Sequence, residues 1–289
     1  MHKFLRAIGF SNIRKKDLKM IIDEIISRPE MMKITKDSEG NEFAEFSKSF
    51  AEQIGITVRG YYDEEEQFQV EYYYPYSIAT HISTNEQIEV EKHAEKESYA
   101  GVCDEIRLGV TLIFYIQNVA EYLSEKRTGV RSVKIQGAVL SALSTDGKIL
   151  LPVYQKQAAK QTILKNEKRN KLIAEAREGN EEAIESLTLE DIDTYSSLSR
   201  RVVKEDIFSI VNTYFMPYGI ESDQYSVLGT ILDVSEEKNF VTKEKIYRIT
   251  IDCNEMIFDI TINEKDLLGE PVIGRRFKGN IWMQGTLCL

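Results

Sequence analysis

The C-terminal segment 225–289 constrains the fold most, because short apolar runs in it alternate with turn residues. Runs rich in β-branched and aromatic residues predict strands at 227–234, 246–251, 257–262 and 277–287. Asn254 and Glu255 predict a tight turn between the second and third runs. So many strands in so short a segment are typical of a small closed or half-closed β-barrel, of which the OB-like barrel is the best-known form.

The segment before residue 155 predicts an α+β domain, in which helices pack on an antiparallel sheet. Leu18, Ile21 and Ile25 repeat with helical spacing, and Pro29 ends that helix. We expect strands at 4–10, 42–50, 56–62, 68–76 and 88–93, and a hairpin of 133–143 with 148–154 over the turn 145–147. Residues 104–126 are ambiguous: their centre could be a buried strand, but the apolar spacing over 108–123 favours a buried helix.

The middle of the chain is divided by charge. Residues 155–177 hold seven Lys and Arg against two Glu, and 178–193 hold seven acids and no base. Asn180 and Thr188 predict the starts of two short helices. We favour a hairpin in which the basic and acidic helices pair, and the alternative is an exposed basic arm. A helix over 207–214, ended by Pro217, leads into the barrel.

These patterns predict three parts. They are an α+β domain at 1–155, a charged helical connector at 156–224 and the small OB-like barrel at 225–289.

Composition restricts the classes of function. The net charge of −10 argues against a duplex-binding protein, which needs a concentrated basic face. Cys103, Cys253 and Cys288 are far apart and form no zinc-binding spacing, and such free cysteines suit a reducing cytoplasm. The N-terminus has no secretory-signal pattern, and the longest apolar run, 110–116, is too short to cross a bilayer. We expect a cytoplasmic protein without a membrane partner.

Catalytic and metal-binding patterns are weak. Cys103 lies ten residues after His93, but the acids that follow it would raise the pKa of its thiol. The acidic run 63–66 lacks the spacing of a calcium loop, and Asp252 and Asp259 are as easily explained as outward-facing strand residues. The sequence predicts no catalytic residue, no metal site and no cofactor, so an enzyme of unknown class is kept only as an alternative.

Two features suggest binding. Arg275, Arg276 and Lys278 stand beside Trp282, the only tryptophan, and basic and aromatic residues on a barrel can hold single-stranded nucleic acid. Against this, 225–289 carries eight bases and ten acids. The second feature is a tyrosine-rich hairpin that suits a protein interface, made of Tyr61, Tyr62, Tyr72, Tyr74 and Tyr76. We therefore expect protein interaction, scaffolding or self-association, with nucleic-acid binding as the alternative.

Three stretches carry a resemblance: GNEEAIESLTLEDIDTYSSLSRR at 179–201, YFMPYGIESDQYSVLGTI at 214–231 and DLLGEPVIGRRFKGNIWMQG at 266–285. With the opening MHKFLRAIGFS, the chain resembles a family of full-length, uncharacterised proteins of Gram-positive bacteria, which is known only as a domain of unknown function. The resemblance spans essentially the whole chain. It implies a bacterial cytoplasmic protein and supplies no activity or site residue.

Overall fold

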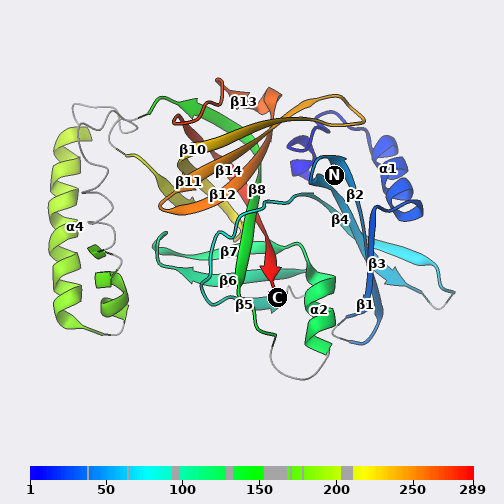
Figure 1. The fold of residues 1–289 in the computed structure, drawn as a ribbon, viewed down its shortest axis with the longest axis horizontal. Coiled ribbons are helices and arrows are strands. Elements are labelled where there is room, and N and C mark those ends of the chain that lie inside the picture. Colours follow the sequence, from blue (N-terminus) through cyan, green and yellow to red (C-terminus); the bar gives the residue numbers. More distant parts are fainter. Residues whose placement is uncertain are drawn as a thin grey trace.

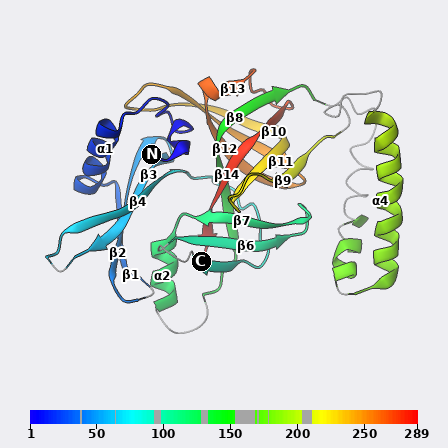
Figure 2. The same cartoon turned by 180° about the vertical axis from the view of Figure 1, so that it is seen from behind.

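The computed structural model describes the chain except residues 38, 64, 93–97, 128–132, 153–167, 170, 178 and 203–210. Strands dominate it and form two sheets, with few helices. Figure 1 shows the smaller sheet and helix α1 on one side of a β-barrel and helix α4 on the opposite side, and the view from behind agrees (Figure 2). The predicted combination of an antiparallel sheet, packed helices and a barrel is confirmed at this level.

The smaller sheet, sheet A, is antiparallel with the order β1-β2-β3-β4. Its strands are β1 (Met31–Lys36), β2 (Glu42–Ala51), β3 (Ile54–Tyr62) and β4 (Phe68–Ser77). Helix α1 (Lys15–Ser27) buries Leu18, Ile21 and Ile25 as its apolar spacing predicts. The strand predicted at 4–10 is wrong: this segment starts with the 3-10 helix η1 (Lys3–Arg6), whose Phe4 and Leu5 enter the core under α1.

A second antiparallel group contains β5 (Glu89–Lys92), β6 (Tyr99–Glu105) and β7 (Val110–Ile116). Helix α2 (Val119–Arg127) follows β7 directly. The buried helix expected over 104–126 is therefore wrong for its first half and right for its end. Leu112, Ile116 and Leu123 are all buried, so a strand and a helix in succession reproduced the spacing of one helix.

The barrel is closed by five strands. They are β8 (Gly137–Leu150), β10 (Gln224–Lys238), β11 (Lys245–Cys253), β12 (Met256–Asn263) and β14 (Arg276–Cys288). Strand β8 pairs with β14 in antiparallel and with β12 in parallel orientation, which completes the ring. The four C-terminal strands confirm the prediction, and the fifth comes from residues before the charged connector. The predicted turn of Asn254 and Glu255 has φ angles of 53° and 67°.

The hairpin predicted over 145–147 is wrong, because β8 is one continuous strand. Asp146 lies opposite Asn280 and Ser144 opposite Ile281, so Thr145 forms a bulge and not a turn. Smaller elements complete the sheet: β9 (Tyr214–Pro217) on β10, η2 (Glu264–Asp266), and β13 (Leu267–Leu268) on β8.

The connector is described in part. Helix α4 (Glu181–Val202) is continuous, so the second helix start predicted at Thr188 is wrong. The Thr188 hydroxyl donates to the Ile184 carbonyl inside the helix, whereas Asn180 caps the helix as predicted. Arg169 forms ion pairs with Glu190 and Asp191, which matches the charge-paired hairpin for the residues that are described.

Two helices predicted in the connector fall partly outside the described residues. The basic helix predicted at 155–177 lies largely outside the described residues. Half of the helix predicted at 207–214 does as well, and the prediction is wrong for the described half, because 211–213 are irregular and Tyr214 begins strand β9. Among the described residues, no helix combines the length and the apolar character that crossing a bilayer requires.

Candidate functional site

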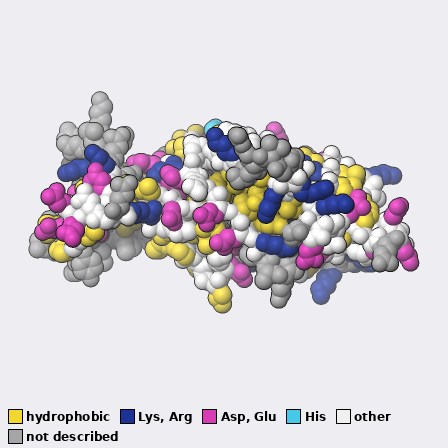
Figure 3. All heavy atoms as spheres, turned by 90° about the horizontal axis from the view of Figure 1, so that it is seen from below, with side chains coloured by type: hydrophobic (Ala, Val, Ile, Leu, Met, Phe, Trp, Pro, Cys, Tyr) yellow, Lys and Arg dark blue, Asp and Glu magenta, His cyan; other side chains and the backbone are white. Residues whose placement is uncertain are grey.

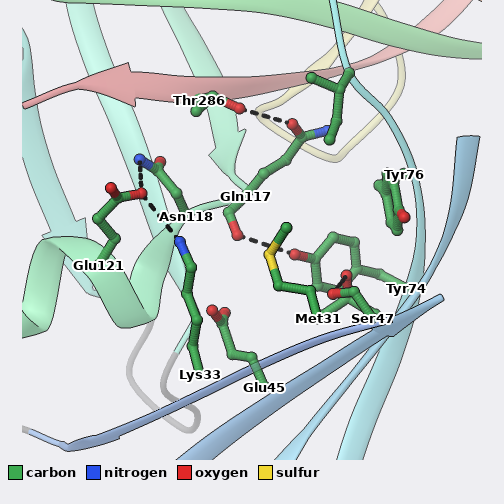
Figure 4. A pocket seen from close by; sticks show the side chains of 12 residues that line it. Met31, Lys33, Glu45, Ser47, Tyr74, Tyr76, Gln117, Asn118, Glu121 and Thr286 are labelled. Carbon is green, nitrogen blue, oxygen red and sulfur yellow. Dashed lines mark hydrogen bonds and ion pairs between the residues drawn. The ribbon is translucent and has the colours of Figure 1, made fainter. Parts of the chain in front are cut away.

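Strand β2 has one mainly apolar side and one mainly polar side, on which Phe43 is the apolar exception. Ala44 and Phe46 face α1 and the apolar cluster beneath it. Glu45 and Ser47 point to the other side, as strand alternation requires. In most two-layer folds that side would face water. Here it is turned toward the end of β7 and the start of α2, so a polar sheet face is enclosed by the protein (Figure 4).

Arg59 of β3 lies at the centre of this face and is completely buried. Its guanidinium donates to the hydroxyls of Tyr72 (3.0 Å), Tyr115 (2.8 Å) and Tyr74 (3.1 Å) and to the carbonyl of Gln117 (2.8 Å). Burial opposes the charged form, but the Glu45 carboxylate and the hydroxyls of Tyr115, Tyr72 and Tyr74 together outweigh it and keep the pKa of Arg59 well above its ordinary value. Arg59 thus stays charged and connects sheet A to β7.

Glu45 is the counter-ion of Arg59 and is itself buried. Its Oε1 lies 2.5 Å from Arg59 Nε, so the two charged groups form a close, buried ion pair. The other oxygen accepts the backbone N–H of Ala120, in the first turn of α2, at 3.3 Å. One oxygen of this buried carboxylate therefore neutralises Arg59, and the other holds the start of α2.

A cavity of about 210 Å³ opens beside Glu45. Its floor is the polar face of sheet A, with Glu45, Ser47, Thr57, Tyr74 and Tyr76. The opposite wall comes from Gln117, Asn118 and Glu121 at the start of α2 and from Thr286 of β14, and Met31, Lys33 and Ile78 complete the lining (Figure 4). The cavity therefore lies where sheet A meets the barrel sheet.

Most hydrogen-bond donors of the wall are already used by the protein. Gln117 Nε2 donates to the Ser77 carbonyl (2.9 Å) and to Gln284 Oε1 (2.8 Å). Asn118 Nδ2 donates to the Leu287 carbonyl (3.0 Å). The Thr286 hydroxyl donates to Gln117 Oε1 (3.0 Å). These contacts hold the wall in place and leave it little to donate to a ligand.

The predicted interface tyrosines take part in this region. Tyr74 and Tyr76 are buried and line the cavity, and Tyr72 is half-buried against Arg59. Tyr61 packs on Phe43, and Tyr62 packs on Phe68. All five rings are engaged within the chain, and their role in binding a partner stays a prediction.

The predicted nucleic-acid residues do not form one surface. Arg276 is buried and donates to the carbonyls of Leu151 and Val211. Trp282 is buried outside the barrel interior, where its ring lies 5.3 Å from that of Phe4 and its Nε1 donates to Asp223. Arg275 donates to the Glu270 carbonyl, and Lys278 is half-buried. A base could stack on Trp282 only by displacing the N-terminal segment.

The weak catalytic candidates are explained by the fold. Burial raises the pKa of the Cys103 thiol to about 12, and His93 lies outside the described residues. Asp63 accepts backbone N–H groups of its own hairpin loop, and Asp259 accepts the Thr250 hydroxyl. Within the part of the chain that the structure describes, no cluster of His, Cys, Asp and Glu could hold a metal ion.

Arg59 and the cavity were missed by sequence reasoning. The only sequence pattern that bears on them is in β2, where Glu45, Ser47 and Ser49 alternate with Ala44 and Phe46. Alternation of this kind is ordinary for a sheet with one wet face. Nothing local indicated that the polar face would be covered.

A protein-family model with the description "Domain of unknown function, E. rectale Gene description (DUF3881)" matches residues 5–285. The chain belongs to the DUF3881 family. This confirms the resemblance predicted from 179–201, 214–231 and 266–285. Apart from Thr286, every residue that lines the cavity lies within the matched DUF3881 span. No curated protein and no solved structure matches the chain.

Proposed function

We propose that this member of the DUF3881 family binds a small molecule in the cavity between sheet A and α2. The observation that carries the proposal is the enclosed polar face of sheet A around Glu45 and Arg59. Burying charged and polar groups costs free energy, and well-packed apolar residues often replace a buried ion pair without loss of stability. A folding role alone therefore gives little reason for this face, whereas a ligand site needs a few fixed polar groups in an apolar cavity.

The size of the cavity limits the ligand. An apolar protein cavity of roughly 150 Å³ is large enough for benzene. The cavity of about 210 Å³ therefore suits a molecule of one ring, or a comparable chain, with a small polar substituent. It is too small for a nucleotide or a folded segment of a partner.

Occlusion of the cavity tests the proposal. Met31 and Met32 are neighbours on β1 with 53% and 54% exposure, but only Met31 lines the cavity. We expect Met31→Trp to abolish the thermal stabilisation that a set of small fragments gives the wild-type protein. Met32→Trp, the matched control, should leave it unchanged. Equal fragment responses in both variants would place ligand binding elsewhere.

Protein interaction is the second candidate, and the edge of sheet A favours it. Strand β1 is an outer strand, and it exposes Met31, Met32 and Ile34. The view from below shows hydrophobic side chains grouped among Lys and Arg (Figure 3). Exposed edge strands readily accept another strand.

Self-association through this edge is directly measurable. Ile34→Lys should lower the sedimentation coefficient of the protein at high concentration if a second copy adds to β1. If the wild-type protein stays monomeric over the same concentrations, self-association through β1 is excluded. Interaction with a different protein is then the form of this proposal that is left.

We also propose that the barrel is OB-like. Strands β10, β11, β12 and β14 would take the first four places, and β8, which comes earlier in the chain, the fifth. The parallel pair of β12 and β8 among antiparallel pairs supports this order.

Nucleic acid usually lies over the second and third strands of an OB barrel, which are β11 and β12 here. In this chain Arg248 donates to the Glu52 carbonyl, Thr261 bonds Ser77, and Asn263 donates to the Arg6 carbonyl. The N-terminal half thus occupies that face. Binding of a single strand there requires this half to move, and a low-salt titration without oligonucleotide binding would end the alternative.

A further inference from the structure

We infer that the ligand is a small organic amine, an ammonium group on an apolar body of about one ring. The inference rests on the proposed function, because it assigns the chemistry of the same cavity. It follows from three properties of the lining: its unused hydrogen-bonding groups, the balance of its charges and the nature of its apolar walls.

The unused groups of the lining are mainly acceptors. Glu45 Oε1 is paired with Arg59, whereas Oε2 accepts the Ala120 N–H at 3.3 Å and keeps a further lone pair. In Glu121, Oε2 receives both contacts that this carboxylate makes, from Asn118 Nδ2 (3.3 Å) and Lys33 Nζ (3.2 Å). Ser47 and Thr57 share one hydrogen bond of 2.8 Å, which leaves lone pairs on both hydroxyls. A ligand gains most here if it brings N–H donors.

The cations near the cavity are already neutralised. Arg59 lies behind Glu45 and Tyr74, and its guanidinium nitrogens contact Glu45, tyrosine hydroxyls and the Gln117 carbonyl. Lys33 pairs with Glu121 on the rim of the cavity (Figure 4). A carboxylate or phosphate would therefore meet two acidic side chains and a single exposed ammonium. An ammonium can contact the same two carboxylates, each of which already holds one cation.

The apolar walls suit the body of an amine. Tyr74, Tyr76, Met31 and Ile78 line the cavity between the polar groups. An ammonium close to a tyrosine ring is attracted by the ring face, and the attraction is stronger when water is excluded. Figure 4 shows the Glu45 carboxylate and the Lys33–Glu121 pair on the same side of the space, across from Tyr76. An amine can thus point its donors to one side and its apolar part to the other.

Three small molecules of similar shape but different charge test whether the cavity prefers a cationic, a neutral or an anionic ligand. Benzylamine, benzyl alcohol and benzoate are titrated into the full-length protein by isothermal calorimetry and by ligand-observed NMR. We expect benzylamine to bind more than tenfold more tightly than benzoate, with the alcohol between them. Glu121→Gln should weaken benzylamine binding roughly fivefold, because it removes one exposed charge contact of the kind worth up to about 1 kcal/mol.

Glu236→Gln is the matched control, because Glu236 is also an exposed glutamate paired with a lysine, Lys245, but lies away from the cavity. It should leave benzylamine affinity unchanged. If benzoate or the alcohol binds as tightly as the amine and Met31→Trp abolishes that binding, the amine inference is wrong and the binding cavity stands. If none of the three binds wild type, both the inference and the small-molecule proposal fail.

Discussion

Glu45 and Arg59 are directly opposite each other on β2 and β3, and their side chains form an ion pair that water does not reach. Both residues point to the enclosed face of sheet A. Glu45 also reaches the first turn of α2, and Arg59 reaches the end of β7, so this one pair joins sheet A to the barrel sheet.

Removing one member of this pair should be costly. Glu45→Gln leaves the Arg59 charge buried without a counter-ion, and we expect a loss of about 3–5 kcal/mol in the free energy of unfolding. The double variant Glu45→Met, Arg59→Met should lose much less, because no charge is then stranded. Urea denaturation followed by circular dichroism measures both. A single variant within about 1 kcal/mol of wild type would contradict the role assigned to the pair.

His2 should make stability depend on pH. Burial against Trp282, the charge of Lys3 and the N-terminal ammonium lower the pKa of His2 to about 4. The unfolded chain keeps a pKa of about 6.5 and so binds more protons than the folded chain between these values. Stability should therefore fall as the pH drops from about 6.5 to about 4.

The measurement compares the melting temperatures of wild type and His2→Gln through this range. Carboxylates titrate in both proteins, so the difference between them isolates His2. The melting temperature of wild type should fall relative to that of His2→Gln as the pH drops. If the two melting temperatures change in parallel with pH, the lowered pKa of His2 is wrong.

The cysteines should differ in reactivity. Burial raises the pKa of the Cys103 and Cys253 thiols to about 12, whereas Cys288 is only half-buried. Thiolates are the reactive form. We expect iodoacetamide at pH 8 to modify Cys288 in the folded protein and the other two only after unfolding. Peptide mass spectrometry gives the rates, and native labelling of Cys103 as fast as that of Cys288 would count against an inert core thiol.

The barrel should not form from the C-terminal segment alone. A fragment of residues 211–289 lacks β8, which leaves β12 and β14 with unpaired edges. Such a fragment should be unfolded or aggregated by circular dichroism and gel filtration, while the whole chain unfolds cooperatively. A monomeric fragment with a cooperative transition would show that four strands suffice.

The sequence predicts strands well where the pattern is local. In β2 and β12, apolar and polar residues alternate along the sequence, and this alternation predicted both strands. Prediction failed where both environments were apolar: Leu112 and Leu123 are buried alike, one on a strand and one on a helix. It also failed at Thr145, where Asp146 and Gly147 carry a turn signal but pair across to β14.

The buried Arg59 and the cavity could not be predicted from local sequence patterns, because their residues come from two different sheets. Arg59 follows Val58 in a strand that otherwise reads as ordinary, and its partner Tyr115 lies on a different sheet. Neither residue indicates the other by spacing. Only the arrangement of the two sheets decides that the polar side of β2 is covered, and that arrangement depends on contacts between segments far apart in the chain.

The pairing of β8 with β14 sets an order of events during synthesis. Gly137 ends opposite Cys288 and Leu150 opposite Arg276, so β8 emerges from the ribosome long before its partner exists. Non-local strand pairings of this kind form slowly. Until β14 is made, the edge of β8 that pairs with it stays open, so the barrel closes late, and a chain truncated before Arg276 cannot close it.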